Sequence, residues 1–568
     1  MSSKEECREQ ILSELTRDFI LNTARQSPLD AVLSEAAGDC RQYLGGTSYA
    51  VSVSETAMEG SRLSQFPYYA VPKCYTLLDT IALDEAGILQ LQNYPGLELQ
   101  GEGVLVGLVD TGINYTLDVF KDLAGNTRIV EIWDQTIQEG ETPEEFGYGT
   151  VYGREAINEA LRAERPQDIV PETDPDGHGT FLASILCGSP DESGEFIGAA
   201  PLAELAVVRL KPAKQYLRDY YYVREGALCY QETDIMAGLR YLDDLAAREG
   251  KPLAVCLALG TNTGSHTGAS PLGKRMNSLA NAARRVVAAG TGNEAEKRHH
   301  FYGILPEEGD RTDVEVRVGA GSRGFMTEIW SDIPNIFELS ISSPSGQVVE
   351  RISIRESMAA YQFVFEQTRV YVSAKVLAEG TNAGVFVLRF DRPAEGIWTI
   401  GVRCVRAGSG IFHLWLPVTE FLDSEIYFLR PDPDCTITEP ANAEDIMTVA
   451  AYNAAENAIA ISSGRGYTRE ERIKPDFAAP GVQVSGYNAR GQLSQRSGTS
   501  ISAAIAAGAG ALLLEWLAVR SGQNVNSVQV KNLLILGTER RKDLTWPNRE
   551  WGYGALNLYQ TFEEFRRY

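Results

Sequence analysis

The chain has 568 residues, of which 44% are hydrophobic and 23% charged, so it is long enough to fold into several packed domains. Its 52 basic and 76 acidic side chains give a formal net charge of −24. This charge disfavours nucleic acid and anionic membrane surfaces as partners, keeps the protein soluble and slightly favours basic substrates.

The first predicted unit covers residues 1–80. Its opening segment carries charge throughout and lacks the apolar block of a secretory signal. Four apolar residues recur there at helical spacing and predict an amphipathic helix: Ile11, Leu12, Leu15 and Phe19. A short strand is predicted at 48–54. The longest apolar run of the chain, 503–514, is too short to span a bilayer, so we expect a protein of an intracellular compartment.

From Gly103 onward the chain alternates apolar strands with helices. The strands are short β-rich runs at 104–110, 202–210, 252–260 and 285–290, and a helix is predicted at 234–248. Continuous apolar strands separated by helices indicate an α/β fold, in which a parallel sheet is covered by helices on both faces.

A different pattern occupies residues 310 to 425, where at least six short runs alternate with a period of two between turn signals. This pattern predicts an antiparallel β-sandwich or jelly roll. The α/β pattern returns at 446–453, so the sandwich is inserted into the α/β domain. The predicted division is therefore 1–80, 81–300, 301–435 and 436–568.

The eight cysteines contain no C-x-x-C pair, and Cys187 and Cys256 lie within apolar runs. This distribution favours buried reduced thiols over a disulfide framework or a zinc site.

No metal and no cofactor are expected. His299 and His300 are adjacent, so on a strand they would point to opposite faces, and no third ligand accompanies them. Asp174 and Asp176 could suggest calcium, but ligands at regular spacing are missing. The segment DPDGHG is better explained as a loop that orders His178.

Three motifs supply an aspartate, a histidine and a serine in that order. VLVGLVDTGIN places Asp110 at the carboxyl end of a strand, DPDGHGT places His178 at the start of a helix, and RSGTSIS places Ser500 at the head of a long apolar helix. A serine hydroxyl needs a base to take its proton, imidazole is the natural base, and a carboxylate orients the imidazole. Each residue alone has an ordinary structural explanation, but all three in order predict a catalytic triad.

A second donor for the oxyanion is expected from the segment VVAAGTGNEA, which places Asn293 just after a strand. The first donor would be a backbone N–H at the start of the helix that carries Ser500.

The motifs DTG, HGT and GTS occur in this order, with AAGTGN between the last two. Together with their neighbouring residues they resemble the subtilase family of serine proteases. The C-terminal segment EWGYGALNLYQTF is similar to that family's closing segment. The resemblance implies a subtilisin-like fold. It also implies a first specificity pocket with two walls, and the residues of these walls are Ala258, Leu259 and Gly260 on one side and Ala289, Gly290 and Thr291 on the other. Gly290 would leave room at the floor of this pocket.

Finer features, such as VVRLKPAKQYLRDYY and GNEAEKRHHFYG, resemble the clostridial Csp-type germination proteases. That resemblance implies an inserted jelly roll, and a prodomain at 1–80 that is cut in the region 72–86 and can stay bound as a non-covalent partner. It also implies a protease that processes the pro-form of a spore cortex hydrolase. Because the sequence shows no signal peptide and no transmembrane segment, we expect a cytoplasmic or spore-associated protein. The chain departs from many subtilases at Ala504 and Ile505, where those have a proline and a histidine.

The sequence is compatible with three functions. The first is an active, self-processing endopeptidase with a dedicated protein or peptide substrate. The second is a catalytically silent subtilase fold that serves as a binding or signalling scaffold. The third is a general protease that degrades peptides.

Overall fold

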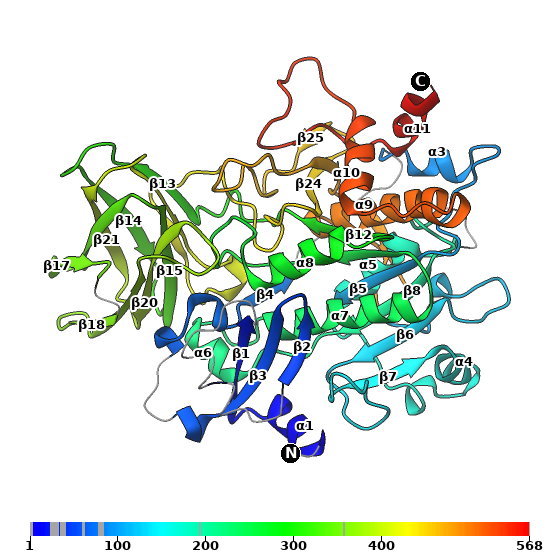
Figure 1. Cartoon of the computed structure of the whole chain (residues 1–568), viewed down its shortest axis with the longest axis horizontal. Helices are drawn as coiled ribbons and strands as arrows, with labels where there is room; N and C mark the ends of the chain where they lie inside the picture. Colours follow the sequence, from blue (N-terminus) through cyan, green and yellow to red (C-terminus); the bar gives the residue numbers. More distant parts are fainter. Residues whose placement is uncertain are drawn as a thin grey trace.

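The computed structural model describes residues 4–22, 33, 41–58, 63–77, 85–191, 194, 196–355 and 358–566. Figure 1 shows three parts within them: a central α/β unit, a β-sandwich beside it on the left, and a small N-terminal sheet at the bottom.

The central unit is built on a nine-stranded sheet in the described part of the chain. Its strands are β5 (Leu105–Asp110), β6 (Ile129–Asp134), β7 (Thr150–Gly153), β8 (Glu204–Arg209), β10 (Leu253–Leu257), β12 (Arg285–Gly290), β24 (Met447–Asn453), β25 (Ala458–Ile459) and β26 (Phe477–Pro480). The inner strands pair in parallel, whereas β7 and β25 pair antiparallel at the edges. The prediction of a parallel sheet is confirmed.

Helices cover both faces of this sheet, because its strands are apolar on both sides. Val106 and Leu108 of β5 face the core beneath α5 (His178–Cys187) and α9 (Thr499–Leu514). Leu105 and Val109 face the opposite core beneath α7 (Glu232–Arg248) and α8 (Pro271–Asn281). The remaining helices of the unit are α3 (Ile88–Gln92), α4 (Arg154–Arg162), α6 (Gln215–Tyr220), α10 (Ser527–Leu536) and α11 (Leu558–Arg566).

Helix α9 continues without a break into a π-helical turn, Glu515–Arg520. Among the described residues, the combined stretch Thr499–Arg520 is the one helix that is long and apolar enough to cross a membrane. The sequence did not predict a helix of this length, because the apolar run 503–514 is shorter. Of its most apolar window, 94% lies buried inside the protein. It is therefore placed as the core helix of the central unit.

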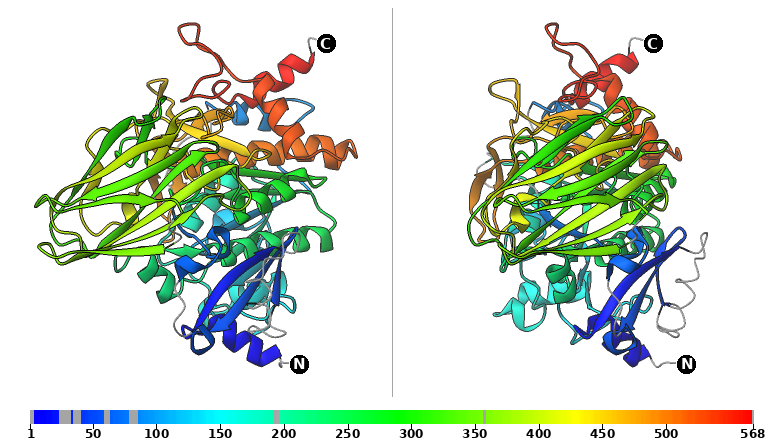
Figure 2. Two further views of the ribbon diagram at one scale, coloured as in Figure 1. Left: turned by 60° about the vertical axis from the view of Figure 1, so that its left-hand side comes forward. Right: turned by 90° about the vertical axis from the view of Figure 1, so that its left-hand side faces the viewer.

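The inserted sandwich consists of two antiparallel sheets around a shared apolar core. One sheet contains β13 (His300–Ile304), β22 (Ile411–Trp415), β15 (Gly324–Asp332), β20 (Ala383–Asp391), β19 (Thr368–Lys375) and β18 (Met358–Phe363). The other contains β17 (Val348–Ser353), β16 (Ile336–Ser342), β21 (Gly396–Arg406), β14 (Arg311–Val318) and β23 (Ile426–Phe428). Figure 2 shows the sandwich face-on in its right-hand view.

The N-terminal unit pairs α1 (Lys4–Leu12) with a three-stranded antiparallel sheet of β1 (Thr16–Asn22), β3 (Ser48–Ser54) and β2 (Arg41–Gly45). The predicted helix is correct as far as Leu12 and wrong beyond it. Leu15 lies in a turn with 71% of its surface exposed, and Phe19 is buried in β1. The reason is tertiary: β1 pairs along its whole length with β3, and this overrides the helical spacing.

The prediction of reduced thiols holds for six buried cysteines: Cys74, Cys187, Cys229, Cys256, Cys404 and Cys435. It is wrong for Cys7, which is disulfide-bonded. Spacing along the sequence cannot reveal which cysteines folding brings together.

A separate three-stranded sheet joins the N-terminal segment to the central unit. Its middle strand is β4 (Cys74–Leu77), which runs antiparallel between β9 (Tyr230–Gln231) and β11 (Leu259–Gly260). The segment that follows the N-terminal unit is therefore held on both sides by strands of the central unit.

Candidate active site

The carboxyl end of the parallel sheet brings Asp110, His178 and Ser500 together. Asp110 is the last residue of β5, His178 is the first residue of α5, and Ser500 is the second residue of α9. Nδ1 of His178 lies 2.8 Å from Oδ1 of Asp110, and its Nε2 lies 3.3 Å from Oγ of Ser500. An ionised carboxylate only accepts hydrogen bonds, so Nδ1 carries the proton and Nε2 offers its lone pair to the serine.

Asp174 holds the strand and helix that carry the first two residues. Its Oδ1 accepts hydrogen bonds from Thr111 Oγ1 (2.7 Å) and Gly177 N (2.9 Å), and its Oδ2 accepts from the backbone and side chain of Thr180. The expected loop-ordering role of DPDGHG is thus visible for Asp174. A side chain at Gly179 would meet the carbonyl oxygen of Gly112 at 2.2 Å, so α5 approaches the segment just after β5 this closely only with glycine there.

The start of α9 is fixed by contacts with the end of β12. Gly292 N donates to Thr499 Oγ1 (3.0 Å), and Thr499 N donates to Asn293 Oδ1 (3.2 Å). This second bond pins the carbonyl oxygen of the Asn293 amide, so its NH₂ group points away from the helix backbone. Asn293 and His178 line one cleft of about 610 Å³, together with Asp176, Thr438 and Arg496 among others.

The six residues predicted to form the specificity pocket occupy different surroundings. Ala258 and Ala289 are buried in the cores on the two faces of the sheet, and Leu259 and Gly260 form β11 beside β4. A side chain at Gly290 would meet the carbonyl oxygen of Thr499 at 2.5 Å, so this glycine makes room for the helix that carries Ser500. The carbonyl of Thr291 accepts a hydrogen bond from Thr438 N (3.0 Å). Their contact with substrate stays a prediction.

Thr438 is a residue that sequence reasoning missed. Its side chain packs against both Gly260 and Gly292, at 2.5 Å from a side-chain carbon built at either position. It therefore lies between the two predicted pocket walls and also lines the cleft of His178 and Asn293. No sequence motif marks Thr438, because it follows the inserted sandwich in the sequence and is distant there from both predicted walls.

Strand β4 lies next to this site. Leu77 is opposite Leu259, and β4 runs antiparallel to β11, so its carboxyl end points back toward the end of β10. Helix α9, which carries Ser500, packs against β10. β9 pairs with the other side of β4, and burial, together with the charges of Asp110 and Asp176, raises the pKa of Tyr230 on β9.

Ser500 has 0% and His178 has 3% of its surface exposed. Ala504 and Ile505, where the sequence departs from many subtilases, are buried in the apolar core along α9.

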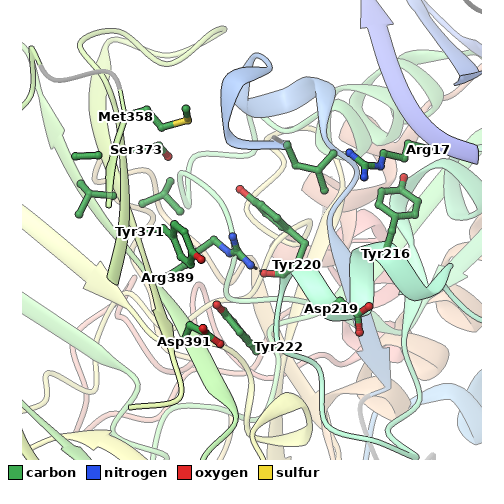
Figure 3. Close-up of a pocket in the computed structure, with 14 residues that line it drawn as sticks. Arg17, Tyr216, Asp219, Tyr220, Tyr222, Met358, Tyr371, Ser373, Arg389 and Asp391 are labelled. Atoms are coloured by element: carbon green, nitrogen blue, oxygen red, sulfur yellow. Dashed lines mark hydrogen bonds between the residues drawn. The ribbon is translucent and has the colours of Figure 1, made fainter. Parts of the chain in front are cut away.

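A second cavity of about 470 Å³ lies where the N-terminal unit, α6 and the sandwich meet. Figure 3 shows Arg389 of the sandwich among the rings of Tyr220, Tyr222 and Tyr371. Its guanidinium carbon is 4.3 Å from the centre of the Tyr220 ring, and its Nε donates to the Tyr220 carbonyl at 2.9 Å. Asp110, His178 and Ser500 do not line this cavity, so we assign it to the junction of the three parts.

Comparison with known proteins identifies relatives for most of the chain. The profile of the Subtilase family matches residues 101–323 and 431–554, and the gap between these ranges holds most of the inserted sandwich. The structure of the Clostridium perfringens CspB protease superposes with a TM-score of 0.76 and 31% sequence identity, over 86% of this chain and 100% of that chain. The resemblance to subtilases and to Csp-type proteases is confirmed.

Two curated relatives match more locally. Serine protease AprX of Bacillus subtilis is 31% identical over 205 residues, which cover 31% of this chain and 40% of AprX. Human membrane-bound transcription factor site-1 protease is 31% identical over 139 residues, 23% of this chain and 13% of that protein. The chain therefore spans less than half of the length of either protein.

Replacing Gly290 with alanine tests the packing that positions the serine. The added carbon would meet the Thr499 carbonyl, so we expect Gly290→Ala to lower the free energy of unfolding by about 1–3 kcal/mol, the usual cost of overpacking. Urea denaturation measures this loss. The matched control is Gly153→Ala, since a side-chain carbon there meets only a Glu155 oxygen at 3.8 Å. Equal stability of both variants would contradict the proposed contact.

Proposed function

The chain belongs to the subtilase family of serine proteases, and from this we propose that it is an endopeptidase that cleaves peptide bonds through an acyl-enzyme on Ser500. The single observation that carries the proposal is the unbroken hydrogen-bond line from Asp110 through His178 to Ser500.

The geometry supports the following steps. Ser500 Oγ attacks the substrate carbonyl while His178 Nε2 takes its proton, and the carboxylate of Asp110 stabilises the imidazolium that results. The oxyanion would be stabilised by a backbone N–H at the start of α9 and by the NH₂ group of Asn293. His178 then gives its proton to the leaving amine, and water hydrolyses the acyl-enzyme by the same route in reverse.

We further propose that the first substrate is the chain itself, with residues 1–80 as its prodomain. Strand β4 is paired on both sides in the manner of an extended peptide substrate. Because its carboxyl end runs toward the sheet edge that carries Ser500, the cut is expected at or just after Leu77. This lies within the region 72–86 that the sequence predicts.

Buried polar contacts favour retention of the prodomain after the cut. Nζ of Lys214 lies 3.0 Å from Asp18, which also accepts hydrogen bonds from Ser52 Oγ and Gln231 Nε2. Closer to the cut, Tyr68 donates to Glu328 of the sandwich at 2.6–2.7 Å. The predicted prodomain is thus bonded both to the central unit, through Asp18, and to the sandwich, through Tyr68, and would remain as a non-covalent partner.

The physiological substrate we propose is a pro-protein that this enzyme processes, as in spore germination. The support is the resemblance to the CspB protease over 86% of the chain. A general peptide-degrading role differs in one measurable respect: it predicts broad cleavage of an unfolded protein such as casein, whereas a dedicated enzyme would leave most of it intact.

The burial of Ser500 favours a second candidate, a silent scaffold whose site stays closed by its own N-terminal segment. Labelling of the folded protein with a fluorophosphonate separates the two. An active enzyme reacts at Ser500, and a closed scaffold does not.

Self-cleavage is tested by the intact mass of the wild type beside Ser500→Ala. We expect two chains from the wild type, separated at or just after Leu77, and a single uncut chain from the variant, because the variant lacks the hydroxyl that lies against His178 Nε2. A Ser500→Ala protein with the same N-terminal cut would refute self-processing.

Replacing Asn293 with alanine removes the proposed side-chain donor. The expected loss in kcat is about 100- to 1000-fold, the order found for one oxyanion donor, with KM nearly unchanged. Steady-state hydrolysis of a peptide substrate measures both constants. Asn281→Ala, on the exposed end of α8, is the control and should keep the wild-type rate. An unchanged kcat in Asn293→Ala would exclude this role.

Retention of the prodomain is tested with Asp18→Asn in cleaved protein. This change leaves the ammonium group of Lys214 buried without its charged partner, so we expect the N-terminal fragment to dissociate at a lower urea concentration than in the wild type. Size-exclusion chromatography across a urea series follows the release. Glu9→Gln, at an exposed position of α1, removes one charge without this contact and should behave as the wild type.

A further inference from the structure

Two imidazoles and one thiol meet at the base of the inserted sandwich. His300 on β13, His413 on β22 and Cys435 are all buried, and their nearest ligand atoms lie within 4.8 Å of one another. Among the described residues no other set of three or more His, Cys, Asp or Glu side chains meets the same criterion. The chain has only five histidines, and the proposed catalytic steps use one of them.

His300 is oriented as a metal ligand. Its Nδ1 lies 3.2 Å from the carbonyl oxygen of Asp432, and a carbonyl only accepts, so Nδ1 carries the proton. Nε2 therefore presents a lone pair, which points at Nδ1 of His413 at 2.9 Å. Imidazoles that bind metals are typically fixed in this way, with the second ring nitrogen donating to a backbone carbonyl.

The other two groups come from separate parts of the chain. β22 pairs antiparallel with β13, which brings His413 to the same edge as His300. Cys435 follows the last strand of the sandwich, and its backbone is bonded at both ends: its N–H donates to Gly466 O (3.1 Å), and its carbonyl accepts from Trp415 Nε1 (3.1 Å). Trp415 also stacks on both imidazoles. The thiol is thus held by contacts independent of the histidines.

All three groups are buried, so an ion bound between them would be shielded from solvent. A thiol binds zinc as the thiolate, so the ion would displace the proton of Cys435.

We propose that His300, His413 and Cys435 form a zinc site that joins the inserted sandwich to the chain segment returning to the central unit. Imidazole nitrogen with thiolate sulfur is a donor set that suits Zn²⁺ and is too soft for calcium or magnesium. Three protein ligands leave the fourth tetrahedral position for a water molecule.

The position of the site assigns it a stabilising role. Two ligands lie on sandwich strands and the third on the exit segment, so the ion would cross-link the two ends of the insert. β13 directly follows His299, which bonds to Glu294 at 2.8 Å, and Glu294 is the neighbour of Asn293. The cross-link therefore holds the chain that leaves the candidate active site, although no zinc ligand belongs to the triad.

The test uses the full-length protein purified without a polyhistidine tag. Elemental analysis should find about one zinc per chain. After chelation and dialysis, titration with Co²⁺ should give the visible bands of tetrahedral cobalt and a thiolate-to-cobalt charge-transfer band in the near ultraviolet. Zinc should also raise the melting temperature of the metal-free protein, because it binds the folded state only.

Two variants locate the site. Cys435→Ser should abolish the charge-transfer band, and His413→Gln should weaken cobalt binding at least 10-fold. Cys404→Ser removes another buried sandwich thiol, and His266→Gln removes another imidazole that stacks on Trp415 at 3.9 Å, so both controls should bind as the wild type. If Cys435→Ser does not fold, protection of the wild-type Cys435 from alkylation by added zinc gives the same information.

Three results would overturn the proposal. These are folded wild type that takes up neither zinc nor cobalt, an unchanged charge-transfer band in Cys435→Ser, and copper in place of zinc in the purified protein. The first would mean that the two imidazoles simply share a hydrogen bond. None of these measurements depends on proteolysis, so the outcome is independent of the proposed function.

Discussion

The candidate active site depends on one close contact between two backbones, that of Gly290 at the end of β12 and that of Thr499 at the start of α9. The carbonyl of Thr499 occupies the space that a side chain at residue 290 would fill, at 2.5 Å from its first carbon. Two hydrogen bonds, to Gly292 and Asn293, hold the same helix end. Ser500 therefore cannot move relative to the sheet edge without breaking them.

The same principle places the other two members of the predicted triad, Asp110 and His178. α5 lies close to the segment just after β5 because Gly179 has no side chain, and Asp174 joins that segment to the start of α5 through four hydrogen bonds. A hydroxyl, an imidazole and a carboxylate from three distant segments thus meet with little freedom, which is what proton transfer along the line requires. The rigidity is provided by packing of the scaffold rather than by the reacting groups.

The inserted sandwich and the N-terminal unit meet the central unit through buried polar groups. Glu328 of the sandwich accepts hydrogen bonds from Tyr68 of the N-terminal segment and from Gly264 N of the central unit. Burial raises the pKa of this carboxyl group, because the charged form loses its hydration. The contacts therefore carry a desolvation cost that an apolar junction would not have. Such groups fix one relative placement of the three parts, because any other arrangement would leave them unpaired.

The sequence by itself determined the local chemistry: the three motifs, the parallel sheet, and the insertion of a β-rich segment between two halves of an α/β unit. These are properties of short stretches, where strand and helix periods and glycine spacing carry the information. Only the tertiary structure decided which remote residues meet. Leu15 and Phe19 lie outside helix α1, contrary to the prediction, because β1 pairs with β3. Thr438 came to lie between Gly260 and Gly292, and His300 was brought to His413 across 113 positions of sequence. Contacts of this kind are set by packing of whole elements, which no local pattern records.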